Sequence, residues 1–266
     1  MAPIKLHGVP FSTCTARVMA CLEEKNVQYE ICPVDLSTGA HKRPDFISKN
    51  PFGQIPVLED RDITLFESRA ICSYIAHKYK DQGTDLLQHG NLHGFTKVMV
   101  GCEVESQQFN PAMGPIFFHT FIAPMRGWAP DQKAIDENVV KVGAVLDVYE
   151  KMLSSSKYLA GDSYTLADLN HLPYITYIMK TPHANLINSR PHVKAWWEAV
   201  SSRPASLKVT QEMTLGSKRS LAYGGGTSEQ LQVESVDYRE ERIGVLLAAG
   251  LVFLLASGGF AAACSC

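Results

Sequence analysis

The sequence predicts two domains of different class, an α/β domain followed by an all-helical domain. Two observations predict this division. Strand-like and helix-like segments alternate over the first eighty residues, whereas residues 91–209 show only helical periodicity. A polar, turn-rich segment from Asp81 to Asp85 separates the two regions. We therefore expect an α/β domain at 1–82, a linker at 83–90 and a helical domain at 91–215.

The α/β domain is predicted from the order of its elements. These are a strand at Ile4–His7, a helix at Thr13–Lys25, a strand at Tyr29–Val34, a helical segment up to about Lys49, a hairpin pairing Val57-Leu58 with Ile63–Leu65, and a closing helix at Glu67–Tyr79. A βαβ unit followed by a ββα unit is typical of a thioredoxin-like α/β domain.

Helical periodicity and one capping motif define the second domain. Its clearest apolar stripe consists of Val139, Val142, Val145, Leu146, Val148, Tyr149 and Leu153. The tetrapeptide Thr165-Leu166-Ala167-Asp168 has the form of a capping box, with Asp in place of the usual Glu. We interpret this box as a structural helix start and not as a catalytic motif.

Composition limits the functions open to the chain. Its 266 residues are 45% apolar and 20% charged, as in an ordinary globular protein, and the net charge of −2 argues against nucleic acid as a partner. The seven cysteines form no Cys-x-x-Cys pair and no zinc-ligand spacing, so we expect free thiols, a reducing compartment and no metal. The N-terminus lacks the apolar core of a secretory signal, which favours the cytoplasm.

Two neighbouring segments carry the most specific functional signal. In Asn50–Leu58 an Asn-Pro turn and a glycine precede Pro56, a residue that cannot donate to a strand ladder and is sometimes cis. The backbone N–H and C=O of Ile55 are then free to pair with an extended ligand. Glu67-Ser68 opens the next apolar periodic run, and a helix N-terminus there would receive a carboxylate. Together the segments predict a site for a small, acidic, peptide-like ligand.

These segments resemble the glutathione site of glutathione transferases, most closely that of the plant phi class. The resemblance extends from Met1 to about Lys208 and includes the segment Tyr158–Asp168. It implies a cytoplasmic homodimeric enzyme of detoxification that uses glutathione as a co-substrate and needs no cofactor. No feature of the family covers the last fifty or so residues.

Ser12 is the predicted catalytic residue. It precedes the helix that starts at Thr13, and a hydroxyl there would donate a hydrogen bond to the glutathione thiolate with help from the helix dipole. The phi class carries a serine at this position. Since serine cannot form a mixed disulfide, Ser12 favours attack by bound thiolate on an external electrophile. Thr13 is a second candidate donor, and Cys14 is interpreted as a packed thiol.

The resemblance also implies the roles of further residues. His41 and Lys42 would bind the glycine carboxylate, Gln54 and Ile55 the cysteinyl backbone, and Glu67 and Ser68 the γ-glutamyl end. Phe52 would insert into the partner subunit. The hydrophobic electrophile would meet Phe11, Phe118, His119 and Phe121. Peroxide reduction is an expected side activity, and a non-catalytic carrier of small aromatic ligands is the alternative function.

The C-terminal segment lies outside the resemblance. Residues 216–242 are polar and glycine-rich, as in a flexible linker. Ile243–Ala263 is an uncharged stretch of 21 residues, about 31 Å as a helix and close to the thickness of a bilayer core. It predicts a membrane anchor that leaves the catalytic domains in the cytosol, with Cys264 and Cys266 as acylation candidates. The alternative is a misassigned exon or an apolar tail on a soluble enzyme.

Overall fold

The computed structural model describes residues 3–213. Its N-terminal half is built around a mixed four-stranded sheet. Its strands are β1 (Ile4–Gly8), β2 (Tyr29–Pro33), β3 (Val57–Asp60) and β4 (Ile63–Phe66), in the spatial order β2-β1-β3-β4. Strand β1 runs parallel to β2 and antiparallel to β3, and β3 pairs antiparallel with β4. The predicted thioredoxin-like α/β domain is confirmed.

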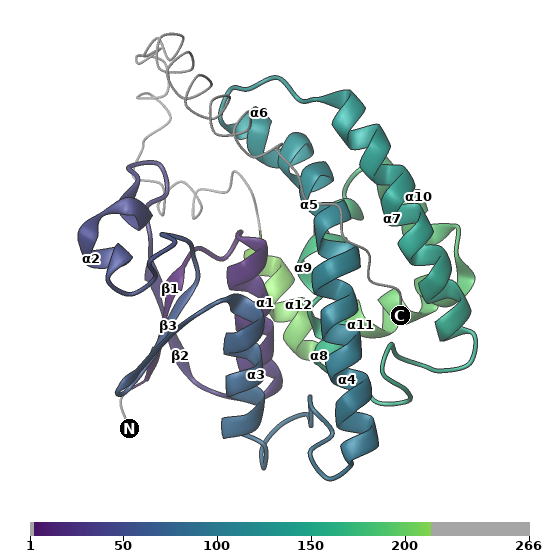
Figure 1. Cartoon of the computed structure of the whole chain (residues 1–266), viewed down its shortest axis with the longest axis horizontal. Coiled ribbons are helices and arrows are strands. Elements are labelled where there is room, and N and C mark those ends of the chain that lie inside the picture. The colour runs from purple at the N-terminus through teal and green to yellow at the C-terminus, as the bar shows by residue number, and fades with distance from the viewer. Residues whose placement is uncertain (1–2, 214–266) are drawn as a thin grey trace, which may run out of the picture. The chain divides into compact units, whose positions relative to one another are not determined.

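Helices cover both faces of this sheet (Figure 1). Successive strand residues point to opposite faces, so neighbouring residues of β3 enter different clusters. Leu58 packs in the large core with residues of α1 (Thr13–Glu24) and α3 (Ser68–Lys78). Val57 packs instead with Phe46 of the short helix α2 (Pro44–Ile47), close to η1 (Ala40–Lys42). The sheet therefore lies between two apolar layers.

The second half of the described chain is helical, as predicted. Between Leu92 and Glu212 the only pairing of strand type in the described residues is an isolated bridge between Tyr158 and Gly161. The elements are α4 (Leu92–Val104), η2 (Glu105–Phe109), α5 (Asn110–Phe117), η3 (Phe118–Ile122), α6 (Ala123–Met125), α7 (Gln132–Leu153), α8 (Leu166–Leu169), α9 (Leu172–Ile178), η4 (Pro182–Ala184), α10 (Asn185–Asn188), α11 (Pro191–Ser201) and α12 (Pro204–Glu212). The segments η2 and η3 are π-helical turns that interrupt the row of helices from α4 to α6.

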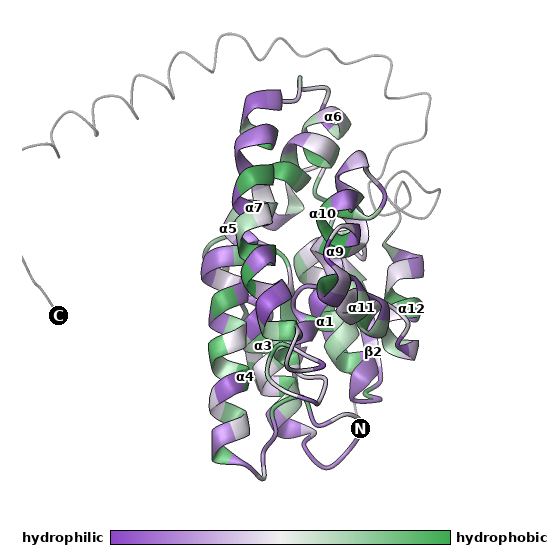
Figure 2. Cartoon of the chain, turned by 90° about the vertical axis from the view of Figure 1, so that its right-hand side faces the viewer, coloured by the Kyte–Doolittle hydropathy of each residue, from purple (hydrophilic) through white to green (hydrophobic). Residues whose placement is uncertain are grey.

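The apolar stripe of α7 follows the prediction except at one residue. Val142, Leu146, Tyr149 and Leu153 are buried, whereas Val148 is 57% exposed. The inclusion of Val148 in the core-facing stripe was wrong, because adjacent helix positions lie about 100° apart and Tyr149 already occupies the inward direction. Hydrophilic and hydrophobic residues alternate along this helix and along α4 (Figure 2).

The predicted capping box is present at the start of α8, and its Asp168 carboxylate also binds groups outside this helix. Asp168 is fully buried and accepts hydrogen bonds from the backbone N–H of Thr165 at 3.0 Å and of Leu159 at 2.9 Å. Its carboxylate also accepts from the indole N–H of Trp196 at 2.9 Å. Burial raises the pKa of Asp168 to about 6 although these donors act to lower it. The box thus joins α8 to α11 and to the preceding loop.

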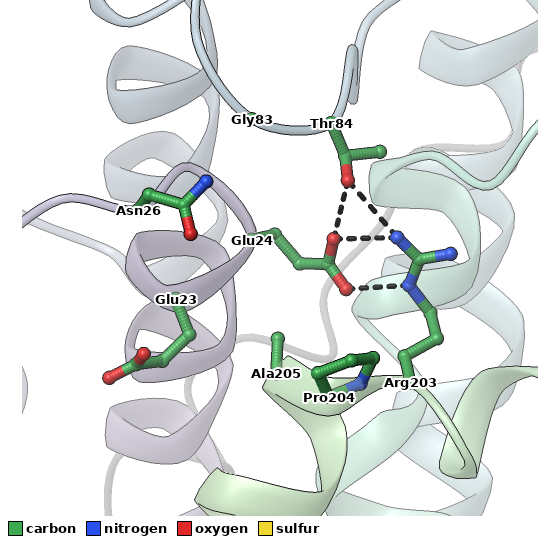
Figure 3. Close-up of a pocket in the computed structure, with 8 residues that line it drawn as sticks. All are labelled: Glu23, Glu24, Asn26, Gly83, Thr84, Arg203, Pro204 and Ala205. Carbon is green, nitrogen blue, oxygen red and sulfur yellow. Dashed lines mark hydrogen bonds and ion pairs between the residues drawn. The ribbon is translucent and has the colours of Figure 1, made fainter.

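An ion pair fixes the segment that follows α3 to the C-terminal end of α1. Arg203 donates to both carboxylate oxygens of Glu24, at 2.6 and 2.7 Å, and to the Thr84 hydroxyl at 3.0 Å (Figure 3). Gly83 adopts φ +62°, and a Cβ there would lie 2.2 Å from the Glu24 carbonyl oxygen, so only glycine fits. These groups line a hollow of about 310 Å³. The charged and polar groups of this hollow already form hydrogen bonds with one another, which indicates a structural role.

Within residues 3–213 no helix combines the length and the apolar character that crossing a bilayer requires. The predicted linker at 216–242, the anchor at 243–263, Cys264 and Cys266 all lie outside the described residues.

His171 is a fully buried base whose tautomer follows from its partners. Its Nδ1 lies 2.8 Å from the Ala167 carbonyl, which can only accept, so Nδ1 carries the hydrogen. The Tyr149 hydroxyl then donates to Nε2 at 3.0 Å. Burial lowers the pKa of His171 to about 4, although the charge of Glu105 acts to raise it. The folded protein therefore keeps this imidazole neutral.

His171 should make the fold sensitive to acid. The unfolded chain protonates this side chain below about pH 6.5 and the folded chain only near pH 4, so stability is lost as the pH falls through that window. Between pH 7.5 and pH 5 the free energy of unfolding of the wild type should fall by about 2 kcal/mol more than that of His171→Gln. Urea unfolding at both pH values measures this difference. Asp168 titrates with the opposite sign but is present in both proteins, and parallel pH profiles would contradict the prediction.

Candidate functional site

The register of the sheet brings four turns of the chain to one end. Gly8 ends β1 opposite Pro33, which ends the parallel strand β2. Val57 starts the antiparallel strand β3 opposite His7, and Phe66 ends β4 opposite Val57. Four segments therefore meet at the same end of the sheet: those that follow Gly8, Pro33 and Phe66, and the one that precedes Val57. They carry the predicted ligand residues Ser12, His41, Lys42, Gln54, Ile55, Glu67 and Ser68.

Ser12 is the N-cap of α1 and is partly exposed. Its backbone is extended, with φ −71° and ψ 128°, and its Oγ accepts a long hydrogen bond of 3.5 Å from the Thr15 N–H. Within the described part of the chain its hydroxyl hydrogen has no acceptor. Thr13 is buried and Cys14 is partly buried, with its Sγ 3.7 Å from the Arg17 guanidinium. Ser12 thus keeps a free donor beside the positive end of a 12-residue helix.

The turn before β3 leaves one peptide unit open. The Ile55–Pro56 bond is cis, and neither the N–H nor the C=O of Ile55 forms a hydrogen bond within residues 3–213. The Asn50 side chain donates to the Gln54 carbonyl at 2.7 Å and accepts from the Phe52 N–H at 3.0 Å, which fixes the turn. An extended ligand can pair with the Ile55 backbone as a further strand would.

The backbone is strained at the start of α3, where the Glu67-Ser68 motif predicted a site for a ligand carboxylate. Glu67 is exposed and adopts φ +67° and ψ 104°, an uncommon conformation for a residue with a side chain. Ser68 is buried, and its Oγ accepts from the Arg17 guanidinium at 2.8 Å. Glu67 makes no side-chain capping hydrogen bond to α3. A free carboxylate and the first N–H groups of a helix therefore lie together, which suits a ligand with both an amino and a carboxylate group.

His41 and Lys42 lie in η1, against the turn that contains Gly53. A Cβ on Gly53, which has φ +57°, would lie 2.7 Å from the His41 carbonyl oxygen. The Lys42 ammonium donates to the Phe52 carbonyl at 3.1 Å, which leaves two of its N–H groups for a ligand. His41 Nδ1 is buried without a partner, and burial, Lys42 and Arg126 lower the pKa of this imidazole. His41 is therefore a neutral donor or acceptor at pH 7.

Phe52 does not fill the core of its own chain. Its side chain is 65% exposed, and its ring lies edge-on to that of Phe66, with centroids 6.1 Å apart. Exposed aromatic rings of this kind are enriched at protein interfaces.

Beneath these turns lies a buried ion network that the sequence did not predict. Arg17 and Glu105 are both fully buried, and Glu105 accepts from Arg17 at 3.4 Å and from Arg69 at 2.6 Å. Arg17 also donates to the Asn170 carbonyl at 3.3 Å. Burial acts to raise the pKa of Glu105, but the charge of Arg17 and the hydrogen bond from Arg69 outweigh it and lower the pKa. The signal available in the sequence was a single charged residue, Arg17, within the otherwise apolar run from Ala16 to Leu22.

The four residues predicted to contact an electrophile fall into two groups. The Tyr177 hydroxyl donates to the Phe11 carbonyl at 2.6 Å, and the Tyr177 ring lies 5.2 Å from that of Phe121. Phe118 and His119 instead contact residues beyond α6. Phe118 packs against Trp128 with ring centroids 6.2 Å apart, and His119 Nδ1 accepts from the N–H of Asp131. Tyr177 is thus a residue of this region that sequence reasoning missed.

No metal centre is evident within the residues that the structure describes. They contain no group of three or more histidine, cysteine or acidic side chains that could hold an ion. The five cysteines among them are free thiols, as predicted.

The Arg17–Glu105 contact should dominate the stability of this region. Removing one partner of a buried ion pair leaves the other charged and unpaired, so Glu105→Gln should lower the free energy of unfolding by about 3 kcal/mol or more. Glu198→Gln is the matched control, because its pair with Lys194 is exposed and 3.9 Å long. The control should change stability by less than about 0.5 kcal/mol. Equal losses in the two variants, measured by urea unfolding, would contradict the assignment.

Comparison with known proteins places this arrangement in a family. The family model of the glutathione S-transferase N-terminal domain matches residues 2–77, and that of the C-terminal domain matches residues 109–204. Glutathione S-transferase F13 of Arabidopsis thaliana is 51% identical over 212 residues, which cover 80% of this chain and 97% of that protein.

Solved structures agree with these matches. Glutathione transferase F7 of Populus trichocarpa superposes with a TM-score of 0.78 at 60% identity, over 80% of this chain and all of that one. Glutathione S-transferase I of maize, solved with an atrazine glutathione conjugate, superposes with a TM-score of 0.76 at 45% identity, over 81% of this chain and all of that one. The chain therefore belongs to the glutathione S-transferase family of enzymes, and within it to the plant phi class.

Proposed function

We propose that this enzyme joins the sulfur of glutathione to electrophilic carbon atoms of hydrophobic compounds, and that Ser12 stabilises the attacking thiolate. The observation that carries the proposal is the position of Ser12. Its hydroxyl caps α1 at the end of the sheet where the Ile55, Glu67 and His41 turns meet, and the hydroxyl hydrogen has no acceptor within residues 3–213.

Local electrostatics at the N-terminus of α1 would favour the thiolate form of glutathione. A free thiol has a pKa of about 8.5, and each unit by which the site lowers that pKa requires about 1.4 kcal/mol of preference for the charged form. A hydrogen bond from the Ser12 hydroxyl and the N-terminal dipole of α1 both favour the charged form. The first turn of α1 contains no acidic side chain that would oppose them.

The remaining turns supply groups that suit each part of glutathione. The γ-glutamyl end carries an amino and a carboxylate group, which match the Glu67 side chain and the start of α3 at Ser68. The cysteinyl backbone would pair with the Ile55 peptide unit and lie near Gln54, which is exposed. The glycine carboxylate would accept from Lys42 and from neutral His41. No further cofactor enters this scheme, because glutathione is itself the reactant.

The hydrophobic substrate would lie against the aromatic residues of the helical half. Phe11 and Phe121 are coupled through Tyr177 and are the nearer group in this proposal, whereas Phe118 and His119 would form an outer wall. The conjugate held by the maize relative, glutathione joined to atrazine, has the type of product that we propose. The same thiolate would reduce hydroperoxides, with a second glutathione closing the disulfide.

Ser12→Ala tests the proposal. Loss of one preorganised donor typically lowers a rate by about 10²–10³, so kcat/KM for a chloronitroarene should fall by that factor while glutathione affinity changes little. Cys14→Ala is the control and should keep most activity. Wild-type turnover in Ser12→Ala at neutral pH would overturn the assignment. Binding of aromatic ligands with no conjugation by the wild type would favour the carrier function instead.

We further propose a homodimer in which Phe52 inserts into the partner subunit. Its exposed ring supports this role, and a buried aromatic anchor can contribute about 2 kcal/mol or more to association. Phe52→Ala should therefore raise the dimer dissociation constant at least about 30-fold without loss of subunit stability. Leu207→Ala, at an apolar residue that is 50% exposed, is the control. An unchanged dimer at low micromolar concentration, measured by sedimentation, would refute the role of Phe52.

The cytosolic placement of these domains, with residues 243–263 as a C-terminal anchor, remains our proposal for localisation. It is supported by the uncharged 21-residue stretch of the sequence. The full-length protein should then stay with membranes during carbonate extraction, and a chain that ends at Ser220 should be released. Equal release of both would exclude the anchor.

A further inference from the structure

Two histidines face each other at the C-terminal end of α3, opposite the end at which Glu67 and Ser68 belong to the proposed glutathione site. His77 lies in the last turn of α3, and His89 lies in the segment between α3 and α4. The Nδ1 atom of His77 and the Nε2 atom of His89 are 2.9 Å apart. The ring centroids are 4.8 Å apart and the planes meet at 74°. The two nitrogens thus face each other within hydrogen-bond distance.

Asp85 determines which nitrogen of His89 carries the hydrogen. Its Oδ1 lies 3.2 Å from His89 Nδ1 and also accepts from the backbone N–H groups of Leu87 at 3.2 Å and Gln88 at 2.9 Å. An ionised carboxylate can only accept, so Nδ1 is the donor and Nε2 presents a lone pair toward His77. His77 must then donate from its own Nδ1 in the metal-free pair.

This arrangement has the form of a carboxylate–histidine–metal triad. Such triads place a carboxylate on one ring nitrogen and the ion on the other, which fixes the tautomer and makes the ligand more basic. Two nitrogens that each lie about 2.1 Å from a tetrahedral ion are about 3.4 Å apart. The observed 2.9 Å would need to widen by only about half an ångström.

We propose that His77 Nδ1 and His89 Nε2 together bind one divalent transition-metal cation of the nickel, copper and zinc class. The proton on His77 Nδ1 moves to its Nε2, so the neutral pair releases no net proton. Asp85 is not a third ligand, in agreement with the absence of a three-residue cluster among residues 3–213. Water completes the coordination, because both side chains reach the surface.

The ion would connect two separate parts of the chain. His77 belongs to the α/β half, whereas His89 belongs to the segment that leads into α4. Phe95 of α4 supports the His77 ring, with centroids 6.1 Å apart. Since the unfolded chain does not hold the two rings together, binding should stabilise the folded state as metal concentration rises.

Titration calorimetry of the untagged full-length protein with nickel chloride at pH 7.5 tests the site. The wild type should bind one ion saturably, and His77→Gln and His89→Gln should each weaken binding at least 10-fold. Asp85→Asn should weaken it by about 10-fold, as loss of a carboxylate behind a ligand histidine does. The matched control is His192→Gln, because His192 is a single exposed imidazole with a carboxylate partner, Glu150, at 2.7 Å.

The control should bind nickel as the wild type does, and circular dichroism should confirm that every variant is folded. Undiminished binding by His77→Gln and His89→Gln would place the ion elsewhere, for example on the thiols, and would overturn the proposal. Failure of the wild type to bind saturably up to 1 mM nickel would overturn it as well. An anomalous difference peak between the two imidazoles in a soaked crystal would support it directly.

Discussion

The buried guanidinium of Arg17 is the contact on which the arrangement of this enzyme depends. It extends from the helix that Ser12 caps and donates to Ser68 at the start of α3, to Glu105 and to the Asn170 carbonyl. A buried charge is tolerated only when it is paired and hydrogen-bonded, so these partners cannot move independently. Two turns of the proposed glutathione site and the helical half of the chain are thereby held in one geometry.

A rigid core of this kind allows the site itself to be built from turns. The sheet register brings four turns to one end of the sheet, and a buried or hydrogen-bonded neighbour fixes each of these turns. Glu67 remains in a strained conformation at φ +67° because the strand before it and the helix after it determine its position. The groups left without internal partners, including the Ile55 peptide and His41 Nδ1, are then available to a ligand.

Much of this organisation was predictable because the signals are local. The order of strand-like and helix-like segments, the Asn-Pro-Phe-Gly turn and the capping box at Thr165 are each read from a few neighbouring residues. Ser12 was chosen from its position before a helix together with the two ligand motifs and the resemblance to the phi class. Arg17 and Glu105 were not predicted, because they lie 88 residues apart and no local pattern relates them. The hint in the sequence was an arginine within the otherwise apolar run from Ala16 to Leu22.

The electrophile region shows a different limit of sequence reasoning. Phe118, His119 and Phe121 were grouped because they are aromatic side chains of one short segment expected near the crevice. The π-helical segment Phe118–Ile122 changes the rotation between successive side chains, so a period of 3.6 residues no longer describes which of them share a face. Phe121 consequently turns toward Tyr177, and Phe118 packs against Trp128. A π-helical segment of this kind depends on tertiary packing, which the local sequence does not show. Val148 was misplaced for a simpler reason, because Tyr149 already takes the position on α7 that faces the core.

The central claim is that the hydroxyl of Ser12 stabilises a thiolate at the N-terminus of α1. The most direct test follows the ultraviolet absorbance of the glutathione thiolate in the complex as a function of pH. In the wild type the pKa of the bound thiol should lie at least about one unit below the value of about 8.5 for a free thiol, and Ser12→Ala should return it close to that value. An equally low pKa in Ser12→Ala, or a wild-type pKa near that of free glutathione, would contradict the account.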